Sequence, residues 1–211
     1  MNDSASIELK RRHAITGILR DTLRMLNQTN RMDMVLNYLA DQARSLMDAH
    51  AAAIYRYMPH EQVWLLEVSS DLPRDFAVLK VMPFQGTLLW SVIFDRKPYA
   101  ITDIQAQMPA LAADAHTCPV LDHWLNLNHI HYGAFMGVPL IVGGAVYGMI
   151  GLHYNVLHTF SSEDVQQALM LADQDALVIE NALLRQEAEQ VAVTAERNRL
   201  ARDLHDSVTQ T

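Results

Sequence analysis

The chain has 211 residues, half of them hydrophobic, and carries a formal net charge of -8 at pH 7. This acidic balance argues against a general nucleic-acid surface, because phosphate backbones require clustered Lys and Arg. No signal peptide is apparent and no stretch approaches the ~20 apolar residues of a membrane span, so we expect a cytoplasmic chain without a membrane segment.

The N-terminal part predicts two helices followed by a β-hairpin. Residues 6–27 place an apolar stripe at helical spacing, and residues 32–47 form a second amphipathic helix suited to packing across a sheet. Residues 51–57 and 63–68 are typical of two strands, with a turn at residues 59–61.

The middle of the chain is less regular. Residues 78–81 suggest a short edge strand, and residues 98–101 begin a further strand. Short helices are expected at 86–95 and 120–127, while the Ala-rich residues 105–117 suggest a loop with helical turns.

The following segment predicts a second hairpin and a helix start. Strands at residues 133–142 and 145–154 are joined by Gly143 and Gly144, a pair typical of a tight hairpin turn. Ser161 is placed to cap a helix, with Asp164 three residues further on completing the capping pattern.

The C-terminal quarter predicts one long helix that forms a coiled coil. Neither Gly nor Pro interrupts residues 162–211, and Leu177, Leu184 and Val191 fall seven residues apart. Because a monomer would leave this stripe in water, we expect a parallel homodimer, which the helix at 6–27 would join. The apolar face then changes phase and continues at Leu200 and Leu204, which is either a stutter in the coiled coil or chance variation in a short segment.

Four segments resemble the GAF domain, a small-molecule sensory fold, and the resemblance covers about residues 21–184. They read Gly-Val-Pro-Leu (137–140), Gly-Ala-Val-Tyr-Gly-Met-Ile-Gly-Leu (144–152), Phe-Ser-Ser-Glu-Asp (160–164) and Ile-Glu-Asn-Ala-Leu (179–183). The resemblance implies an α+β fold with an antiparallel sheet of five or six strands. It also implies the first and last helices on one face and a ligand pocket on the other.

Aromatic residues and histidines supply candidates for that pocket. The proposed lining is Trp90, Trp124, Tyr132, Phe135 and His131, and the same aromatic side chains could equally be plain core. His129 and His131 alternate, so on a strand they would share a face, and a haem or metal site is conceivable beside the alternative of scattered histidines. No spacing matches a closed zinc site, and no metal is assigned.

The single cysteine, Cys118, excludes an internal disulfide and fits a reducing compartment. In bilin-binding relatives of the GAF domain a linking cysteine is usually followed by His, whereas Pro119 follows here. A covalent bilin is therefore not expected, and the ligand of the domain stays unassigned.

Chemistry on imidazole is indicated by the last stretch, residues 196–210. Leu200, Leu204 and Val208 form one helical face, and His205 lies beside it with Asp206 adjacent. A carboxylate can accept the hydrogen bond of one ring nitrogen and raise the nucleophilicity of the other.

This stretch resembles the phosphoacceptor box of sensor histidine kinases, in the subfamily that signals to NarL-type response regulators. It matches at Glu196, Arg197, Arg199, Ala201, Arg202, Leu204, His205, Asp206, Val208 and Gln210. It departs at Leu200, where the pattern has Ile, and at Asp203, where it has Glu. The resemblance implies that His205 is the phosphoacceptor and that Asp206 is its base or orienting group. Gln210 would position a water that removes phosphate from the response regulator.

Together these patterns divide the chain into three parts. Residues 1–184 would form the GAF sensor with an N-terminal dimerisation helix, 185–195 a coiled-coil linker, and 196–211 the start of a phosphotransfer helix. We expect a catalytic domain to follow this chain and to bind ATP and Mg²⁺. Without that domain, this chain would have no kinase activity. The alternative is a GAF ligand-binding and dimerisation module without phosphotransfer, which leaves the histidine box unexplained.

Overall fold

The sheet has six strands, all paired antiparallel. The computed structural model describes residues 32–83, 92, 94–107 and 119–209. The strands are β1 (Ala51–Met58), β2 (Val63–Ser70), β3 (Val81–Pro83), β4 (Tyr99–Ile101), β5 (Ala134–Val142) and β6 (Ala145–Tyr154). They lie in the order β3-β2-β1-β6-β5-β4, so β1 and β6 occupy the centre although they are far apart in sequence. The predicted α+β fold with a five- to six-stranded antiparallel sheet is confirmed.

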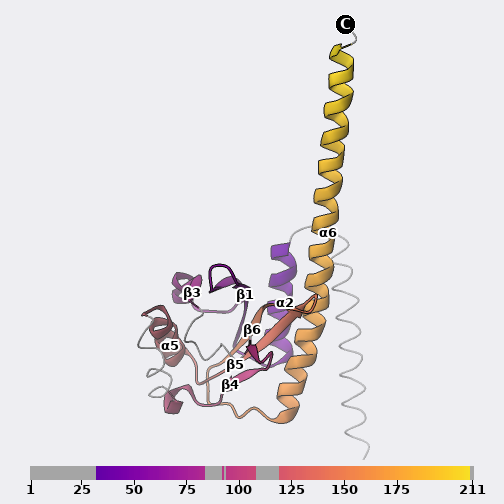
Figure 1. The fold of residues 1–211 in the computed structure, drawn as a ribbon. Helices are drawn as coiled ribbons and strands as arrows, with labels where there is room; N and C mark the ends of the chain where they lie inside the picture. The colour runs from indigo at the N-terminus through magenta and orange to yellow at the C-terminus, as the bar shows by residue number, and fades with distance from the viewer. Residues whose placement is uncertain (1–31, 84–91, 93, 108–118, 210–211) are drawn as a thin grey trace, which may run out of the picture.

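Helices cover both faces of this sheet. Helix α2 (Met32–Leu46) and helix α6 (Ser162–Thr209) pack on one face, where α6 contacts α2 and β5. The 3-10 helix η1 (Arg74–Leu79) and helix α5 (Pro119–His131) lie toward the other face (Figure 1). Helix α6 continues far beyond the sheet as a single projecting rod.

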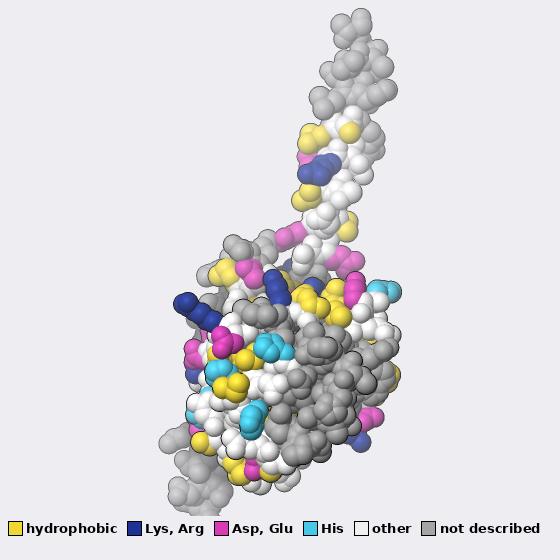
Figure 2. All heavy atoms as spheres, turned by 90° about the vertical axis from the view of Figure 1, so that its left-hand side faces the viewer, with side chains coloured by type: hydrophobic (Ala, Val, Ile, Leu, Met, Phe, Trp, Pro, Cys, Tyr) yellow, Lys and Arg dark blue, Asp and Glu magenta, His cyan; other side chains and the backbone are white. Residues whose placement is uncertain are grey.

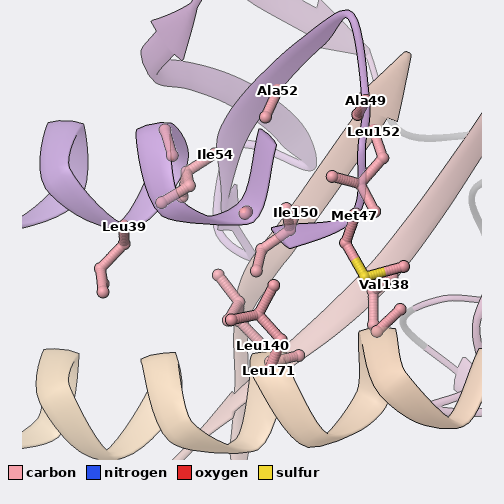
Figure 3. Packing of buried hydrophobic residues seen from close by; sticks show 14 of the residues in the cluster. Leu39, Met47, Ala49, Ala52, Ile54, Val138, Leu140, Ile150, Leu152 and Leu171 are labelled. Carbon is pink, nitrogen blue, oxygen red and sulfur yellow. The ribbon is translucent and has the colours of Figure 1, made fainter. Parts of the chain in front are cut away.

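The core between the sheet and helices α2 and α6 is aliphatic. Strand residues at alternate positions point toward the helices, as period-2 geometry requires, and include Ile54, Leu140 and Ile150. Leu39 of α2 and Leu171 of α6 meet them from the helix side (Figure 3). This packing fixes α6 to the sheet and therefore fixes the direction in which α6 leaves the domain.

Two local predictions about the C-terminal half are confirmed. Gly143 and Gly144 connect β5 to β6 with φ of 57° and 79°, the positive values that such a turn needs. At the start of α6, the Asp164 amide donates to Ser161 Oγ at 3.1 Å, and the Ser161 amide donates to Asp164 Oδ2 at 2.8 Å. This reciprocal cap satisfies backbone donors that a helix start leaves without partners.

The structure corrects two predictions in the middle of the chain. Residues up to Leu79 belong to η1, and the edge strand β3 begins at Val81, where its register with Leu65 of β2 starts. The predicted helix at 120–127 extends to His131, so His129 and His131 lie on a helix rather than on a strand. The helix continues because Asn128 extends its buried face by one turn and donates its side-chain amide to the Trp124 carbonyl. Two residues apart on a helix means about 200° apart, so the two histidines do not share a face.

Several predictions fall on residues outside the described ones. These are the helix at 6–27, most of the helix at 86–95, and most of the loop at 105–117. Within the part of the chain that the structure describes, no helix is both long and apolar enough to cross a membrane.

Candidate ligand site and C-terminal helix

The sheet face opposite α2 and α6 carries a second core that is mostly aromatic. Tyr55 of β1, Phe135 of β5 and Met149 of β6 point to this face, because each alternates with a residue of the aliphatic core. Phe76 of η1 and Trp124 of α5 close over them. Figure 2 looks onto the side of the molecule that carries α5 and β3, and histidine side chains gather at its surface.

The polar centre of this aromatic core is His153 of β6, which is completely buried. Its Nδ1 lies 2.9 Å from Asn128 Oδ1, and the Asn128 amide nitrogen donates to the Trp124 carbonyl at 2.8 Å. Because the amide nitrogen of Asn128 is used in that way, its oxygen faces the ring and Nδ1 must carry the proton. His153 Nε2 is then unprotonated and can only accept a hydrogen bond, and among the described residues it has no hydrogen-bond partner.

Aromatic rings surround His153. The ring centroids of Tyr132, Phe135 and Phe76 lie 4.8, 5.0 and 5.9 Å from the His153 ring. Burial lowers the pKa of His153 from 6.5 to about 3, so the imidazole is neutral at physiological pH. A buried acceptor without a partner costs about 1–3 kcal/mol.

Three of the five predicted pocket residues meet in this cluster. Trp124, Tyr132 and Phe135 are buried there, and the rings of Trp124 and Phe135 lie edge to face at 5.3 Å. His131 stands at the margin, with Nε2 3.7 Å from Asp75 Oδ2 and its side chain 30% exposed. Trp90 and Cys118 lie outside the described residues.

Sequence reasoning missed the central members of the cluster. The sequence patterns did not point to His153, Tyr55, Phe76 or Asn128 as site residues. The sequence did contain one signal for His153, the alternation of side chains along a strand. His153 follows Met149 and Gly151 at alternate positions of an apolar strand. That phase placed His153 on the face opposite the long helix.

Among the described residues, no group of three or more His, Cys, Asp or Glu side chains could hold a metal ion. The arrangement instead surrounds a neutral imidazole with aromatic side chains, of which Tyr55 and Trp124 contribute further buried polar atoms, Oη and Nε1.

The family model described as GAF domain matches residues 29–180. The chain belongs to the GAF domain family. Solved structures that it resembles include the GAF domain of a phosphoenolpyruvate-protein phosphotransferase from Coxiella burnetii, with 19% identity and a TM-score of 0.60, covering 81% of this chain and 95% of that one. Another is the domain of a putative two-component sensor histidine kinase protein from Sinorhizobium meliloti 1021, with 15% identity and a TM-score of 0.54, covering 78% and 98%.

A third similar structure is the GAF domain of the cyanobacteriochrome TePixJ, with 16% identity and a TM-score of 0.57, covering 75% of this chain and 95% of that one. These identities establish a shared GAF fold and no shared ligand. No curated protein sequence matches the chain.

Helix α6 exposes a regular apolar stripe that begins within the GAF domain and continues past it. Met170, Leu177, Leu184 and Val191 recur every seven residues and are 56%, 56%, 58% and 63% exposed. The helix runs without a break to Thr209 and so includes His205 and Asp206, whose side chains lie outside the described part of the structure. Gln210 also lies outside it.

We expect burial of neutral His153 to make the GAF domain less stable in mild acid. The unfolded chain binds a proton at a pKa near 6.5 while the folded chain does not, so the free energy of unfolding falls as pH falls below 6.5. Between pH 7 and pH 5 the expected loss is about 2 kcal/mol. Urea unfolding at the two pH values measures it.

The matched comparison is His153→Asn, whose amide can still donate to Asn128 Oδ1 but does not titrate. Asp175 titrates with the opposite sign, because burial raises its pKa well above the usual value, but it is present in both proteins and cancels in the difference. An equal pH dependence in wild type and variant would contradict the prediction.

Proposed function

We propose that this chain is the sensory part of a two-component sensor histidine kinase of the subfamily that signals to NarL-type response regulators. A signal in the GAF domain would control ATP-dependent phosphorylation of His205. The phosphoryl group would then pass from His205 to an aspartate of the response regulator. ATP and Mg²⁺ would be held by a separate catalytic domain.

The observation that carries this proposal is the continuity of α6. One helix is buried in the GAF core at Leu171 and Ile179 and continues through the histidine box to Thr209. At 1.5 Å per residue, His205 lies about 39 Å beyond Ile179 along the same rod. A rotation or shift of α6 on the sheet would therefore be transmitted to the histidine box.

The chemistry at the box follows from the side chains found there. A neutral imidazole of His205 has one nucleophilic nitrogen, which attacks the γ-phosphorus of ATP to form a nitrogen–phosphorus bond and release ADP. Asp206 would accept the hydrogen bond of the other ring nitrogen, stabilise the positive charge that develops on the ring and take up the proton of that nitrogen, which leaves a neutral phosphohistidine. The resemblance to the phosphoacceptor box supports both roles.

The test is phosphorylation of the chain in the presence of ATP, Mg²⁺ and the catalytic domain of the parent kinase. The expected product is an acid-labile, base-stable phosphate that mass spectrometry maps to His205. Absence of such a phosphate, with an intact catalytic domain, would favour a GAF module that binds ligand and dimerises without phosphotransfer.

A parallel homodimer is part of this proposal, and the exposed stripe supports it. Leaving four large apolar side chains in water along α6 is unfavourable by about 25 cal/mol per Å² of the surface that a partner would bury. A second copy presents the same stripe at the same spacing and can therefore pair with it in register.

We expect Leu184→Glu to shift the chain from dimer to monomer, because it places a charge in the seam of both helices. Analytical ultracentrifugation at tens of micromolar measures the change. The matched control is Val193→Glu, since Val193 is also exposed but lies about 180° around the helix from Leu184. Dissociation by both variants equally, or by neither, would contradict a seam through Leu184.

Gln210 is the proposed phosphatase residue, and Gln210→Ala is expected to separate the two activities. The Gln amide can orient a water for attack on the aspartyl phosphate of the regulator, but it cannot act as a base. In a kinase that completes the helical hairpin, the variant should keep His205 phosphorylation and lose most dephosphorylation of the regulator. An equal loss of both activities would indicate a structural role for Gln210, and no loss of either activity would indicate that Gln210 takes no part in them.

A further inference from the structure

We propose that Asp175 makes the docking of α6 on the sheet depend on a proton. The helix packs on the sheet while the Asp175 carboxyl is protonated, and it loosens when the proton leaves for solvent and a carboxylate forms. This docking equilibrium belongs to the GAF domain alone. Its consequence for phosphorylation of His205 rests on the proposed function, because the same helix continues into the histidine box.

Asp175 occupies the middle of the buried face of α6. The residues three and four positions away on either side belong to the aliphatic core between α6, α2 and the sheet; they are Leu171, Ala172, Val178 and Ile179. Residues at these spacings share one helical face, so the carboxyl projects from the centre of that face. Its side chain is accordingly only 2% exposed. Docking of α6 therefore removes this carboxyl from water.

The Asp175 carboxyl is also incompletely paired. Its Oδ2 is buried and has no hydrogen-bond partner among the described residues. On α6 itself, Asp173 is exposed and Glu180 lies about 140° around the helix from Asp175. A carboxylate without a partner is far more costly to bury than a neutral carboxyl, and burial raises the pKa of Asp175 well above its usual value of 3.8.

The ionisable groups of the two elements that pack on α6 are engaged elsewhere. Strand β5, which contacts α6, contains no ionisable residue. On α2, the Tyr38 hydroxyl accepts a hydrogen bond from Gln42 at 2.6 Å. Asp41 and Arg44 of the same helix both bond to the Ser70 hydroxyl of β2. Neither element therefore supplies a partner for a charge on the buried face of α6 in the part of the chain that is described.

The central strands β1 and β6 do not supply a partner either. Tyr147 and Tyr154 of β6 pack against the aliphatic core, and burial raises the pKa of both phenols above the usual value of 10, so they stay neutral where a carboxyl titrates. Tyr147 donates to Glu67 Oε2 at 2.6 Å, and Glu67 Oε1 pairs with Arg56 Nε of β1 at 2.9 Å. The charge that changes within this interface is thus that of Asp175.

The direction of the pH effect follows from the raised pKa. Below pH 3.8 the carboxyl is protonated whether α6 is docked or not. Above that pH the undocked helix loses the proton while the docked helix keeps it, so docking weakens as pH rises toward the raised pKa. The docking equilibrium constant falls by up to about tenfold per pH unit in this window. The sign is opposite to that of His153, whose burial destabilises the domain in acid.

Hydrogen exchange followed by mass spectrometry tests the coupling segment by segment. Between pH 5 and pH 7, the protection of amides 168–180 in wild type should fall about tenfold or more relative to Asp175→Asn, which cannot titrate. The exposed Asp173→Asn is the matched control and should behave as wild type. Equal pH dependence in wild type and Asp175→Asn would overturn the proposal. So would an equal fall in residues 51–70 of the first hairpin, since the proton would then stabilise the whole domain rather than the docking of α6.

The infrared spectrum at pH 6 reports the proton directly. Wild type and Asp173→Asn should show the carbonyl stretch of a protonated carboxyl, and Asp175→Asn should lack it. Asp175→Leu serves both comparisons if Asp175→Asn does not fold, because leucine suits the aliphatic surround. A folded wild type without this band would carry a buried carboxylate and overturn the proposal. None of these measurements involves phosphate on His205, so a failure of the kinase proposal and a failure of this one are distinguishable.

Discussion

Replacement of His205 by glutamine is expected to abolish acid-labile phosphorylation of the chain. Glutamine has a similar length and tolerates a helix well, so α6 should persist. Its amide nitrogen is conjugated with the carbonyl and has no nucleophilic lone pair to attack phosphorus. The measurement is transfer of labelled phosphate from ATP in the presence of the catalytic domain of the parent kinase, followed by acid and base treatment.

Two comparisons make this result specific. His158→Gln changes a histidine of the GAF domain, next to Tyr154 and Phe160, and should leave the labelling unchanged. Asp206→Asn should slow the transfer without preventing it, because it removes the orienting charge but keeps the shape of the side chain. Labelling that persists unchanged in His205→Gln would rule out His205 as the phosphoacceptor.

The parts of the fold that sequence predicted well are those whose cause is local. The turn between β5 and β6 needs two residues that accept positive φ, and Gly143 and Gly144 are adjacent in the chain. The start of α6 is set by a pair three residues apart, Ser161 and Asp164. In both cases the interacting groups lie within one turn, so the sequence alone contains the geometry.

The parts that sequence missed depend on contacts between distant segments. The bond between His153 and Asn128 joins residues 25 positions apart, on β6 and α5, and neither residue type is distinctive by itself. The short edge strand β3 was misplaced for a related reason, since its start at Val81 is defined by pairing with Leu65 of β2. Such pairings become visible only when the sheet is assembled.

Helix α6 has one feature that the local sequence predicts and one that becomes visible only in the assembled domain. Its heptad stripe was predicted from Leu177, Leu184 and Val191, and the structure adds Met170 at the same spacing on the exposed side of the GAF domain. The stripe thus begins on the part of α6 that also packs on the sheet. Leu200 is also exposed, but it lies nine residues after Val191 and therefore about 180° around the helix.

This change of face has a consequence for the dimer. In the continuous α6, one straight two-helix interface cannot bury both Val191 and Leu200. Either the helix twists locally between them or a different partner surface covers Leu200. This gives a physical reason to expect a change in helix packing just before the histidine box, where a signal from the GAF domain would have its effect.

The second large expected effect concerns stability and falls on Gly148 in the central strand β6. A Cβ at this position would overlap the backbone carbonyl oxygen of Tyr55 on β1 and lie 3.0 Å from the Cα of Arg56. Because these are backbone atoms of a paired strand, β1 and β6 must separate to admit a methyl group. We expect Gly148→Ala to lower the free energy of unfolding by about 3 kcal/mol and the melting temperature by about 6–12 °C.

The matched control for this prediction is Gly137→Ala on the neighbouring strand β5. A Cβ there would meet only side-chain atoms, the Phe135 ring at 3.3 Å and Met149 Sδ at 3.5 Å, and both can shift by a few tenths of an ångström. Its cost should stay below about 1.5 kcal/mol. Urea unfolding of both variants at pH 7 provides the comparison. A cost for Gly148→Ala no larger than that of Gly137→Ala would show that β1 and β6 do not need their close backbone approach.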